Sequence, residues 1–319
     1  MQAIRVHSGG ELRYETVPDP EPGPGQVVVE LKAAALNRRD LLVREGVYPY
    51  PLPLVLGSDG AGVRRDTGAE VVINPGVHWG PSEEASGPEF EILGGPDHGT
   101  FAELVAVPAE NLFPKPARLS WEEAAALPLA GVTAYRALFG RARLRNGERV
   151  LVLGAGSGVS SFAVQLAVQG GAEVLVTSSS DEKLARAREL GATAGVNYGT
   201  EDWVAWAKDR GGVDVVIDSV GSTWPQSLEC LRPGGRCVVF GATGGTDVQL
   251  PVRPFYFAQW SLLGTRMGSP ADFAGLIAAV EHGAWCPVVD SVRPLEQAAE
   301  ALSRLQDGGH FGKLVLSCS

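Results

Sequence analysis

The chain has 319 residues, 45% of them hydrophobic and 20% charged, which is typical of a soluble globular protein with room for two domains. Its net charge of -10 argues against nucleic acid or an anionic membrane as a partner. No apolar stretch reaches membrane-spanning length and no secretory signal is evident, so we expect a cytoplasmic protein. The cysteines lack the paired spacing of a zinc or disulfide framework and are expected to be reduced, mostly buried thiols: Cys230, Cys237, Cys286 and Cys318.

The amino-terminal part of the chain is predicted to be rich in β-strands. Apolar or alternating runs, separated by proline and glycine, lie at residues 26–31, 60–63, 69–73 and 100–107. From Ser120 the pattern becomes helical, because Ser120 and Glu123 form a capping box before an apolar run. Strands and helices then alternate, with later strands expected at residues 213–218, 237–240 and 261–264. This alternation predicts an α/β fold with a doubly wound parallel sheet.

Residues 149–192 carry the most informative pattern, a strand, a glycine-rich turn, a helix and a second strand. The first strand is expected at residues 150–153 and the helix at 159–169. A turn this small lets backbone N–H groups approach a pyrophosphate, and the helix N-terminus favours the anion. Ser160 stands where a third glycine is usual, which predicts adapted packing of helix on strand. A purely structural turn is the alternative to a dinucleotide held by Gly154, Gly156, Ser157, Gly158 and Val159.

The end of the second strand, at residues 173–176, indicates which dinucleotide binds. NAD-binding versions place an acidic residue there, whereas this chain has hydroxyl residues at 177–180 and Lys183 a turn later. Hydroxyls and a cation suit a 2′-phosphate, which a carboxylate would repel, so the sequence favours NADPH. Asp181 is acidic and close but lies past the usual position, and it could equally cap a helix that begins at Glu182. A polar loop with an N-cap is the alternative.

The order and spacing of several motifs resemble the medium-chain dehydrogenase/reductase superfamily over nearly the whole chain. They read ALNRRD at residues 35–40, GVYP at 46–49, LGSDGAG at 56–62, LPLAGVTAYRAL at 127–138 and HFGKLVL at 310–316. The resemblance implies a GroES-like, β-rich catalytic domain at residues 1–116 and a Rossmann dinucleotide-binding domain at 117–266. A carboxyl-terminal segment, residues 267–319, would return to the catalytic domain.

Zinc alcohol dehydrogenases of this superfamily bind the catalytic metal through a Cys, a His and usually a second Cys, with a Glu beside the His. The matching residues here are Asn37, Ser58, Leu129 and Asp59. Catalytic zinc needs three N, S or O ligands, so we expect no metal. Residues 74–94 match a second zinc lobe but contain no cysteine. We interpret that stretch as a solvated loop, in preference to a site built from His78, Glu83 and Glu84.

Without a Lewis acid, the resemblance favours the zinc-free quinone oxidoreductase and enone reductase branch. It implies hydride transfer from NADPH to a quinone or an α,β-unsaturated carbonyl. The catalytic candidates are Asn37, which would orient or polarise the acceptor, Tyr48, which offers a phenolic O–H, and Asp59. Loop stabilisation is the alternative for Asn37, and aromatic packing for Tyr48. Asp40 and Asp59 are expected to order loops by accepting backbone N–H groups more than to act as acid or base.

Further cofactor contacts are expected from family positions and from the strand ends where such sheets bind ligands. They are Ser178, Lys183 and Tyr198 around the 2′-phosphate, Thr133 near the nicotinamide, and Gly241, Thr243 and Met267 after the later strands. Sheet-edge packing is the alternative for Tyr198, and backbone bonding within a helix is the alternative for Thr133.

Two other functions stay open: an alcohol dehydrogenase with an unusual metal site around Asp59, and a non-catalytic NADPH-binding protein. The strand at residues 261–264 would lie at an exposed sheet edge, and such edges are usually paired or protected. Relatives pair two of these edges, so we expect a homodimer. The expected partner in solution is a small-molecule carbonyl or quinone substrate, with no nucleic-acid or membrane partner.

Overall fold

The computed structural model describes residues 1–318 of the chain. Contacts between residues divide it into two units: unit 1 consists of Met1–Val132 with Gly268–Ser319, and unit 2 consists of Thr133–Met267. The boundaries that the sequence suggested, after residues 116 and 266, stay predictions. No helix in the described part of the chain is long and apolar enough to cross a membrane. All four cysteines are free thiols, and three of them are buried: Cys230, Cys237 and Cys318.

Unit 1 is β-rich, as expected of a GroES-like domain, and its main sheet has seven strands. The path of that sheet is β10 (Leu112–Pro114), β6 (Glu70–Ile73), β5 (Asp59–Arg64), β3 (Gln26–Ala35), β18 (Lys313–Ser317) and β17 (Val289–Pro294), with β9 (Leu104–Pro108) also paired to β3. A three-stranded sheet joins β2 (Leu12–Thr16), β1 (Gln2–Val6) and β4 (Leu54–Val55). Strand β18 pairs with β3, so a strand from the carboxyl-terminal segment lies in the same sheet as strands from the amino-terminal part of the chain.

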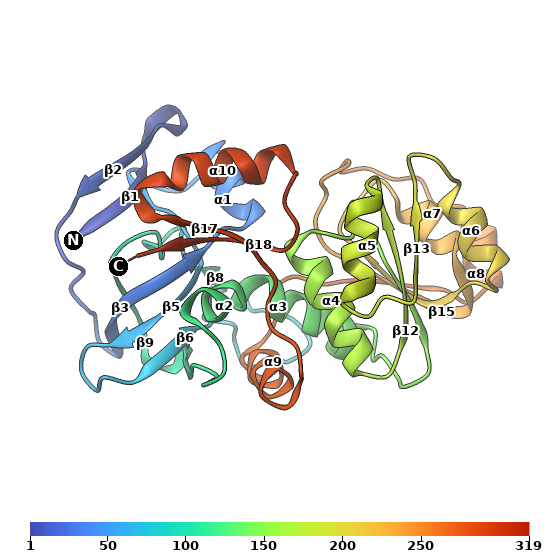
Figure 1. Ribbon diagram of the computed structural model, residues 1–319, viewed down its shortest axis with the longest axis horizontal. Helices are drawn as coiled ribbons and strands as arrows, with labels where there is room; N and C mark the ends of the chain where they lie inside the picture. The colour runs from blue at the N-terminus through green and yellow to red at the C-terminus, as the bar shows by residue number, and fades with distance from the viewer. Residues whose placement is uncertain (319) are drawn as a thin grey trace. The chain divides into compact units, whose positions relative to one another are not determined.

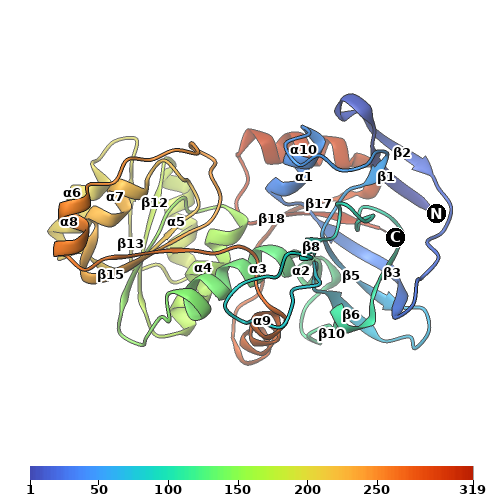
Figure 2. The same cartoon turned by 180° about the vertical axis from the view of Figure 1, so that it is seen from behind.

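Unit 1 also contains helices, of which those that begin at Arg38, Trp121 and Pro270 have capping boxes. The helices are α1 (Arg38–Arg44), α2 (Trp121–Ala126), α3 (Pro128–Tyr135, which ends in unit 2), α9 (Pro270–His282) and α10 (Ala298–Asp307). The capping box of α2 is present, with Ser120 Oγ accepting the Glu123 N–H at 3.2 Å. Helix α10 lies beside α1 and over β17 and β18 (Figures 1 and 2). These elements enclose one apolar core that includes Leu31, Leu56, Phe101 and Leu302.

Unit 2 is a doubly wound sheet of six parallel strands, as the sequence predicted. The order is β13 (Ala194–Asn197), β12 (Glu173–Ser178), β11 (Arg149–Val152), β14 (Val213–Asp218), β15 (Leu231–Val239) and β16 (Ser261–Gly264). The chain runs outward from β11 in both directions, so the order switches between β11 and β14. In such sheets ligands bind outside the carboxyl ends of the strands at that switch point.

Helices lie on both faces of this sheet, which explains why its central strands are apolar on both sides. They are α4 (Gly158–Gln169), α5 (Asp181–Glu189), α6 (Trp203–Asp209), α7 (Trp224–Glu229) and α8 (Val252–Phe257). Figures 1 and 2 show α4 and α5 on one face, with α6 and α7 on the other. Val150, Leu151 and Val152 of β11 are fully buried between them.

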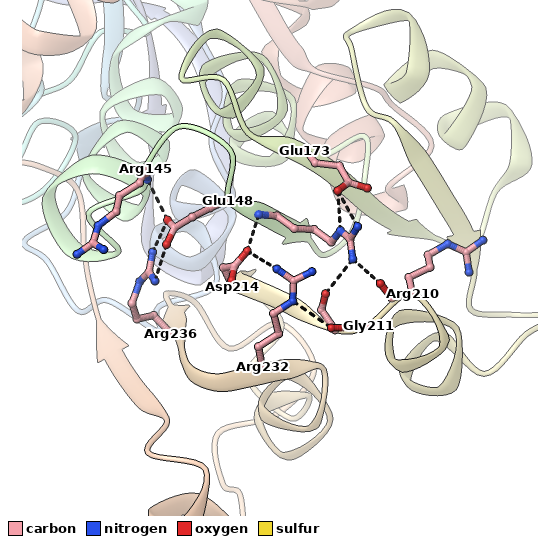
Figure 3. Close-up of polar contacts among 10 residues, drawn as sticks. Arg145, Glu148, Glu173, Arg210, Gly211, Asp214, Arg232 and Arg236 are labelled. Carbon is pink, nitrogen blue, oxygen red and sulfur yellow. Dashed lines mark hydrogen bonds and ion pairs between the residues drawn. The ribbon is translucent and has the colours of Figure 1, made fainter.

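The amino ends of the parallel strands are joined by ion pairs (Figure 3). Glu148, just before β11, accepts two hydrogen bonds from Arg236 at 3.0 and 2.6 Å. Asp214 of β14 accepts from Arg232 at 3.0 Å, and Glu173 of β12 accepts from Arg149 at 2.8 Å. Ion pairs thus link the amino ends of the strands, and the glycine-rich turn lies at the opposite end, where β11 finishes.

Candidate active site

Four residues match the catalytic zinc site of zinc alcohol dehydrogenases and are called the metal-matching positions: Asn37, Ser58, Asp59 and Leu129. Neighbouring strands of unit 1 bring some of them together. Strand β3 ends at Ala35, which lies opposite Asp59 at the start of β5, and Asn37 follows two residues later. Gly57 precedes this point with φ at 94°, and a Cβ there would lie 2.3 Å from the Phe101 ring. Glycine is therefore required in the turn that delivers Asp59 to the site.

Both carboxylate oxygens of Asp59 have hydrogen-bond partners. Oδ1 accepts the Leu129 N–H at 2.8 Å, and Oδ2 accepts from Asn37 Nδ2 at 2.9 Å. Asp59 is completely buried, so these bonds stabilise its charge where water cannot. The structure therefore joins Asp59, Asn37 and Leu129. Ser58 turns away from them and donates to the Leu93 carbonyl at 2.7 Å.

A buried lysine, which the sequence analysis did not single out, completes this cluster. Lys313 Nζ donates to Asn37 Oδ1 at 2.6 Å, to the Leu36 carbonyl at 2.6 Å and to Asp59 Oδ2 at 3.0 Å. Lys313 is 2% exposed. In the sequence, Lys313 begins an otherwise apolar terminal strand, which indicates a buried ammonium. A buried ammonium needs anionic or carbonyl partners, so this pattern could have marked Lys313 as part of a site. Its partners lie far away in the sequence and could not be read from it.

Asp40 lies beside this cluster, in the first turn of α1. Its Oδ2 accepts the Asn37 N–H at 2.7 Å, and the residue is 2% exposed. Burial raises the pKa of the Asp40 carboxyl to about 7, although the Asn37 N–H and the charges of Arg39 and Lys313 act in the opposite direction. The carboxyl therefore changes its charge near neutral pH.

Tyr48 is placed differently from the other catalytic candidates. The residue is 42% exposed, and the Arg39 guanidinium lies 5.7 Å from its ring centroid. The same guanidinium lies 5.4 Å from the Tyr50 ring and donates to Tyr50 Oη at 3.1 Å. The structure thus places Tyr48 against Arg39 and not in the hydrogen-bonded cluster of Lys313, so its role as a donor stays a prediction.

Residues 74–94 are held by packing. Trp79 and Phe90 are 4% and 8% exposed, and their rings meet edge to face with centroids 5.0 Å apart. The expectation of a solvated loop is therefore wrong for this pair, because two aromatic side chains bury each other beside the short hairpin of β7 (Gly76–Val77) and β8 (Glu91–Ile92). His78, Glu83 and Glu84 are exposed. Within residues 1–318, no group of three or more His, Cys, Asp or Glu is placed to hold a metal ion.

The glycine-rich turn of unit 2 has the geometry that close approach of a phosphate requires. Gly154 and Gly156 have φ of 69° and 107°, and a Cβ on Gly154 would meet nothing within 4 Å. Ser157 is the N-cap of α4, in which Gly158 and Val159 are the first residues. The residues present thus fit a pyrophosphate at this turn.

Ser160 replaces the usual third glycine through hydrogen bonds. Its hydroxyl donates to the Leu153 carbonyl at 3.0 Å and lies 2.7 Å from Ser157 Oγ. The residue is 4% exposed. The adapted packing that the sequence suggested therefore consists of a hydroxyl that bonds the strand end directly.

Ser178, the last residue of β12, lies beside Tyr198, the residue that follows β13. The Tyr198 N–H donates to the Ser178 carbonyl at 3.0 Å, and Tyr198 is 50% exposed. The expectation that Asp181 caps a helix from Glu182 is wrong: α5 begins at Asp181, and Ser180 Oγ caps it by accepting the Lys183 N–H at 3.3 Å. Asp181 instead accepts from Asn197 Nδ2 at 2.8 Å.

The remaining cofactor candidates also lie in unit 2. Gly241 follows β15 with φ at 79°, and Thr243 Oγ1 donates to the Ser219 carbonyl at 3.4 Å. Met267 is buried with φ at 46°, and Thr133 is buried within α3. Their contacts with a cofactor stay predictions.

The strand order and glycine turn of unit 2, together with the β-rich unit 1, define a dinucleotide-binding oxidoreductase. Residues 23–117 match the family described as alcohol dehydrogenase GroES-like domain, and residues 158–282 match the family described as zinc-binding dehydrogenase. A zinc-type alcohol dehydrogenase-like protein of Schizosaccharomyces pombe is 40% identical, over 92% of this chain and 91% of its own length. The quinone oxidoreductase of Mus musculus is 32% identical, over 99% of this chain and 97% of its own length.

Solved structures agree with these matches. A crystal structure of an NAD-dependent alcohol dehydrogenase covers 100% of both chains with 40% identity and a TM-score of 0.92. The chain belongs to the medium-chain dehydrogenase/reductase superfamily.

Proposed function

We propose that the chain is a zinc-independent, NADPH-dependent oxidoreductase that transfers hydride to a quinone or an α,β-unsaturated carbonyl. The observation that carries this proposal is the state of Asp59. It is the one carboxylate at the metal-matching positions, and both of its oxygens already accept hydrogen bonds inside the protein. Asn37 offers a neutral amide, Ser58 is bound to a carbonyl and Leu129 has no ligand atom in its side chain. These residues do not fit catalytic zinc.

A conjugated acceptor suits a site of this kind. NADPH, when held at the glycine turn, would supply a hydride. The acceptor takes that hydride at carbon, its oxygen gains negative charge, and a proton from water completes the reduced product. Hydrogen-bond donors that are fixed in advance stabilise such charge best. Asn37 has one amide hydrogen beyond the bond to Asp59, and it is the candidate donor. The mouse quinone oxidoreductase among the relatives supports this class of acceptor.

The preference for NADPH is supported by the residues after β12. Ser178 and Ser179 stand where an NAD enzyme carries an acid, and Lys183 lies in the first turn of α5. Asp181, the nearest carboxylate in the sequence, is bound to Asn197. A 2′-phosphate would thus meet hydroxyl groups and a cation.

A zinc-dependent, NAD-linked alcohol dehydrogenase is the second candidate, because relatives with 40% identity carry those names. Elemental analysis of the purified protein, paired with NADPH oxidation on a quinone and enone panel, separates the two functions. The proposal predicts turnover without stoichiometric zinc. Turnover of alcohols that requires zinc would support the second candidate.

A homodimer is part of the proposal. Strand β16 is the last strand of its sheet, next to β15 alone. Helix α8, which precedes it, exposes Val252, Tyr256 and Phe257 by 74%, 58% and 65%. An open strand edge beside exposed apolar side chains favours pairing with a second copy. Light scattering at several concentrations tests this, and a monomer at micromolar concentration would contradict it.

A further inference from the structure

The Asn37 side chain is bound at both ends by opposite charges. Its Oδ1 accepts from the Lys313 ammonium at 2.6 Å, and its Nδ2 donates to the Asp59 carboxylate at 2.9 Å. Reversing the amide would place its NH₂ group against an ammonium and its oxygen against a carboxylate. Both hydrogen bonds would then be lost in a site that is nearly closed to water, so the arrangement allows one orientation.

Lys313 uses its whole donor capacity in this arrangement. An ammonium has three N–H groups, and Leu36, Asn37 and Asp59 supply three acceptors between 2.6 and 3.0 Å. Lys313 and Asp59 are 2% and 0% exposed, so neither charge is screened by solvent. The ammonium therefore acts as a fixed cation beside the carboxylate at the metal-matching positions.

The backbone around Lys313 places its side chain beside Asn37 and Asp59. Gly312 precedes it with φ at 95°, and a Cβ there would lie 2.4 Å from the Val288 carbonyl oxygen. Strand β18 then pairs with β3, where Val315 lies opposite Ala35. The residue that begins β18 is thereby held next to the end of β3, from which Asn37 follows.

We propose that Lys313 is a positioning residue: its ammonium serves as a built-in cation that neutralises Asp59 and locks the Asn37 amide so that the second Nδ2–H is the donor available to an acceptor oxygen. The catalytic part of this inference rests on the proposed function, whereas the charge-pairing part does not. Lys313 acts through Asn37 and is not itself placed against substrate.

A double-mutant cycle on the turnover number tests the catalytic part. Lys313→Met keeps an unbranched side chain one atom shorter than lysine and removes its charge. We expect kcat for an enone such as cyclohexenone to fall about 10- to 100-fold, with KM changed less than about 3-fold, because the lost orientation matters most in the transition state. In the Asn37→Ala background, Lys313→Met should reduce kcat further by less than about 3-fold. If the two reductions multiply, Lys313 does not act through Asn37 and the proposal is overturned.

Two further variants separate orientation from general damage. Lys313→Arg keeps the charge and should recover part of the lost kcat. The matched control is Lys208→Met, which removes an exposed ammonium 2.8 Å from Glu229 and should leave kcat within about 2-fold. The dissociation constant of NADPH should stay unchanged in Lys313→Met. Loss of NADPH binding there would point to a disrupted fold and would count against a positioning role.

Thermal melting tests the charge pair independently of turnover. Lys313→Met and Asp59→Asn should each lower the melting temperature by about 10 °C, because each leaves a buried charge unpaired. The double variant restores a neutral pair and should melt no lower than either single variant, even if Lys313→Met alone fails to fold. Additive losses would overturn the charge-pairing part. If the wild type reduces none of the acceptors yet shows this coupling, the proposed function fails and the built-in cation stands.

Discussion

The hydroxyl of Ser160 donates to the carbonyl oxygen of Leu153 at 3.0 Å and so ties the first turn of α4 to the end of β11. The bond lies directly beside the glycine turn, because Gly154 follows Leu153 in the chain. A buried hydroxyl thus does here by hydrogen bonding what a glycine does elsewhere by close packing.

Ser160→Ala is expected to lower the free energy of unfolding by about 1–2 kcal/mol, since it removes the bonds to Leu153 and Ser157. Urea unfolding measures this. The matched control is Ser303→Ala, which removes an exposed hydroxyl bonded within α10 and should cost no more than about 0.5 kcal/mol. Equal losses in the two variants would show that the Ser160 contact has no special weight.

Ser178→Asp is expected to raise the dissociation constant of NADPH at least about 10-fold and to leave that of NADH nearly unchanged. The new carboxylate would repel a 2′-phosphate, and it can still accept the Ser180 N–H that Ser178 Oγ accepts at 3.2 Å. Calorimetric titration with each dinucleotide measures both constants. Equal binding of NADPH and NADH by the wild type would refute a 2′-phosphate site at Ser178 and Lys183.

The Asp40 carboxyl is expected to lower the free energy of unfolding of the wild type as pH rises from about 4 to about 7. Asp40→Asn should remove this part of the pH dependence. The folded-state pKa of Asp40, about 7, lies above its unfolded value near 4, so the folded protein holds the proton more tightly. The contribution is complete below the unfolded pKa and is lost as pH passes through the folded one, by at most about 4 kcal/mol.

Urea unfolding at pH 5 and pH 8 tests this for the wild type, Asp40→Asn and the exposed control Asp66→Asn. Asn at position 40 can still accept the Asn37 N–H, so the cap of α1 is kept. The pH dependence should weaken in Asp40→Asn alone. Identical pH dependence in all three proteins would mean that the Asp40 carboxyl is charged throughout this range.

Glu148→Gln is expected to lower the melting temperature by several degrees without changing NADPH affinity. Burial raises the pKa of Glu148, but the hydrogen bonds from Arg236 and the Arg145 N–H outweigh it and lower the pKa overall. This stabilisation is present at neutral pH and is lost as pH falls through the lowered folded-state pKa. Glu148 lies just before the amino end of β11, where it meets Arg145 and Arg236 (Figure 3), whereas the glycine turn follows the carboxyl end of β11. A large loss of NADPH affinity would contradict a purely structural role.

The sequence predicts the strands of unit 2 well because each is a short apolar run between polar or glycine residues. The strands expected at residues 213–218 and 261–264 have those bounds in the structure, whereas the strand expected at 237–240 is the end of a longer one, β15, which begins at Leu231. Strand β3 extends to Ala35, beyond the expected end at residue 31, because small residues there pair with β5 and β18 from distant parts of the chain. Such pairings leave no local pattern.

In the candidate site, too, local sequence patterns could be predicted and contacts between distant residues could not. The glycine turn and the hydroxyl residues that stand in place of an acid at the end of β12 are local patterns and could be read directly. The ion pair between Asp59 and Lys313 could not be predicted from the sequence, because the two residues are 254 positions apart and only the fold brings them together. The cap of α5 was misassigned by one residue, because Ser180 and Asp181 are both good N-cap residues and tertiary contact with Asn197 draws Asp181 away.

The most direct test of the central claim is reduction of an enone by NADPH with protein that has been dialysed against a chelator and checked by elemental analysis. We expect full turnover at less than about 0.1 zinc per chain, because the residues at the metal-matching positions supply too few ligands. Turnover that disappears on chelation and returns with added zinc would contradict it.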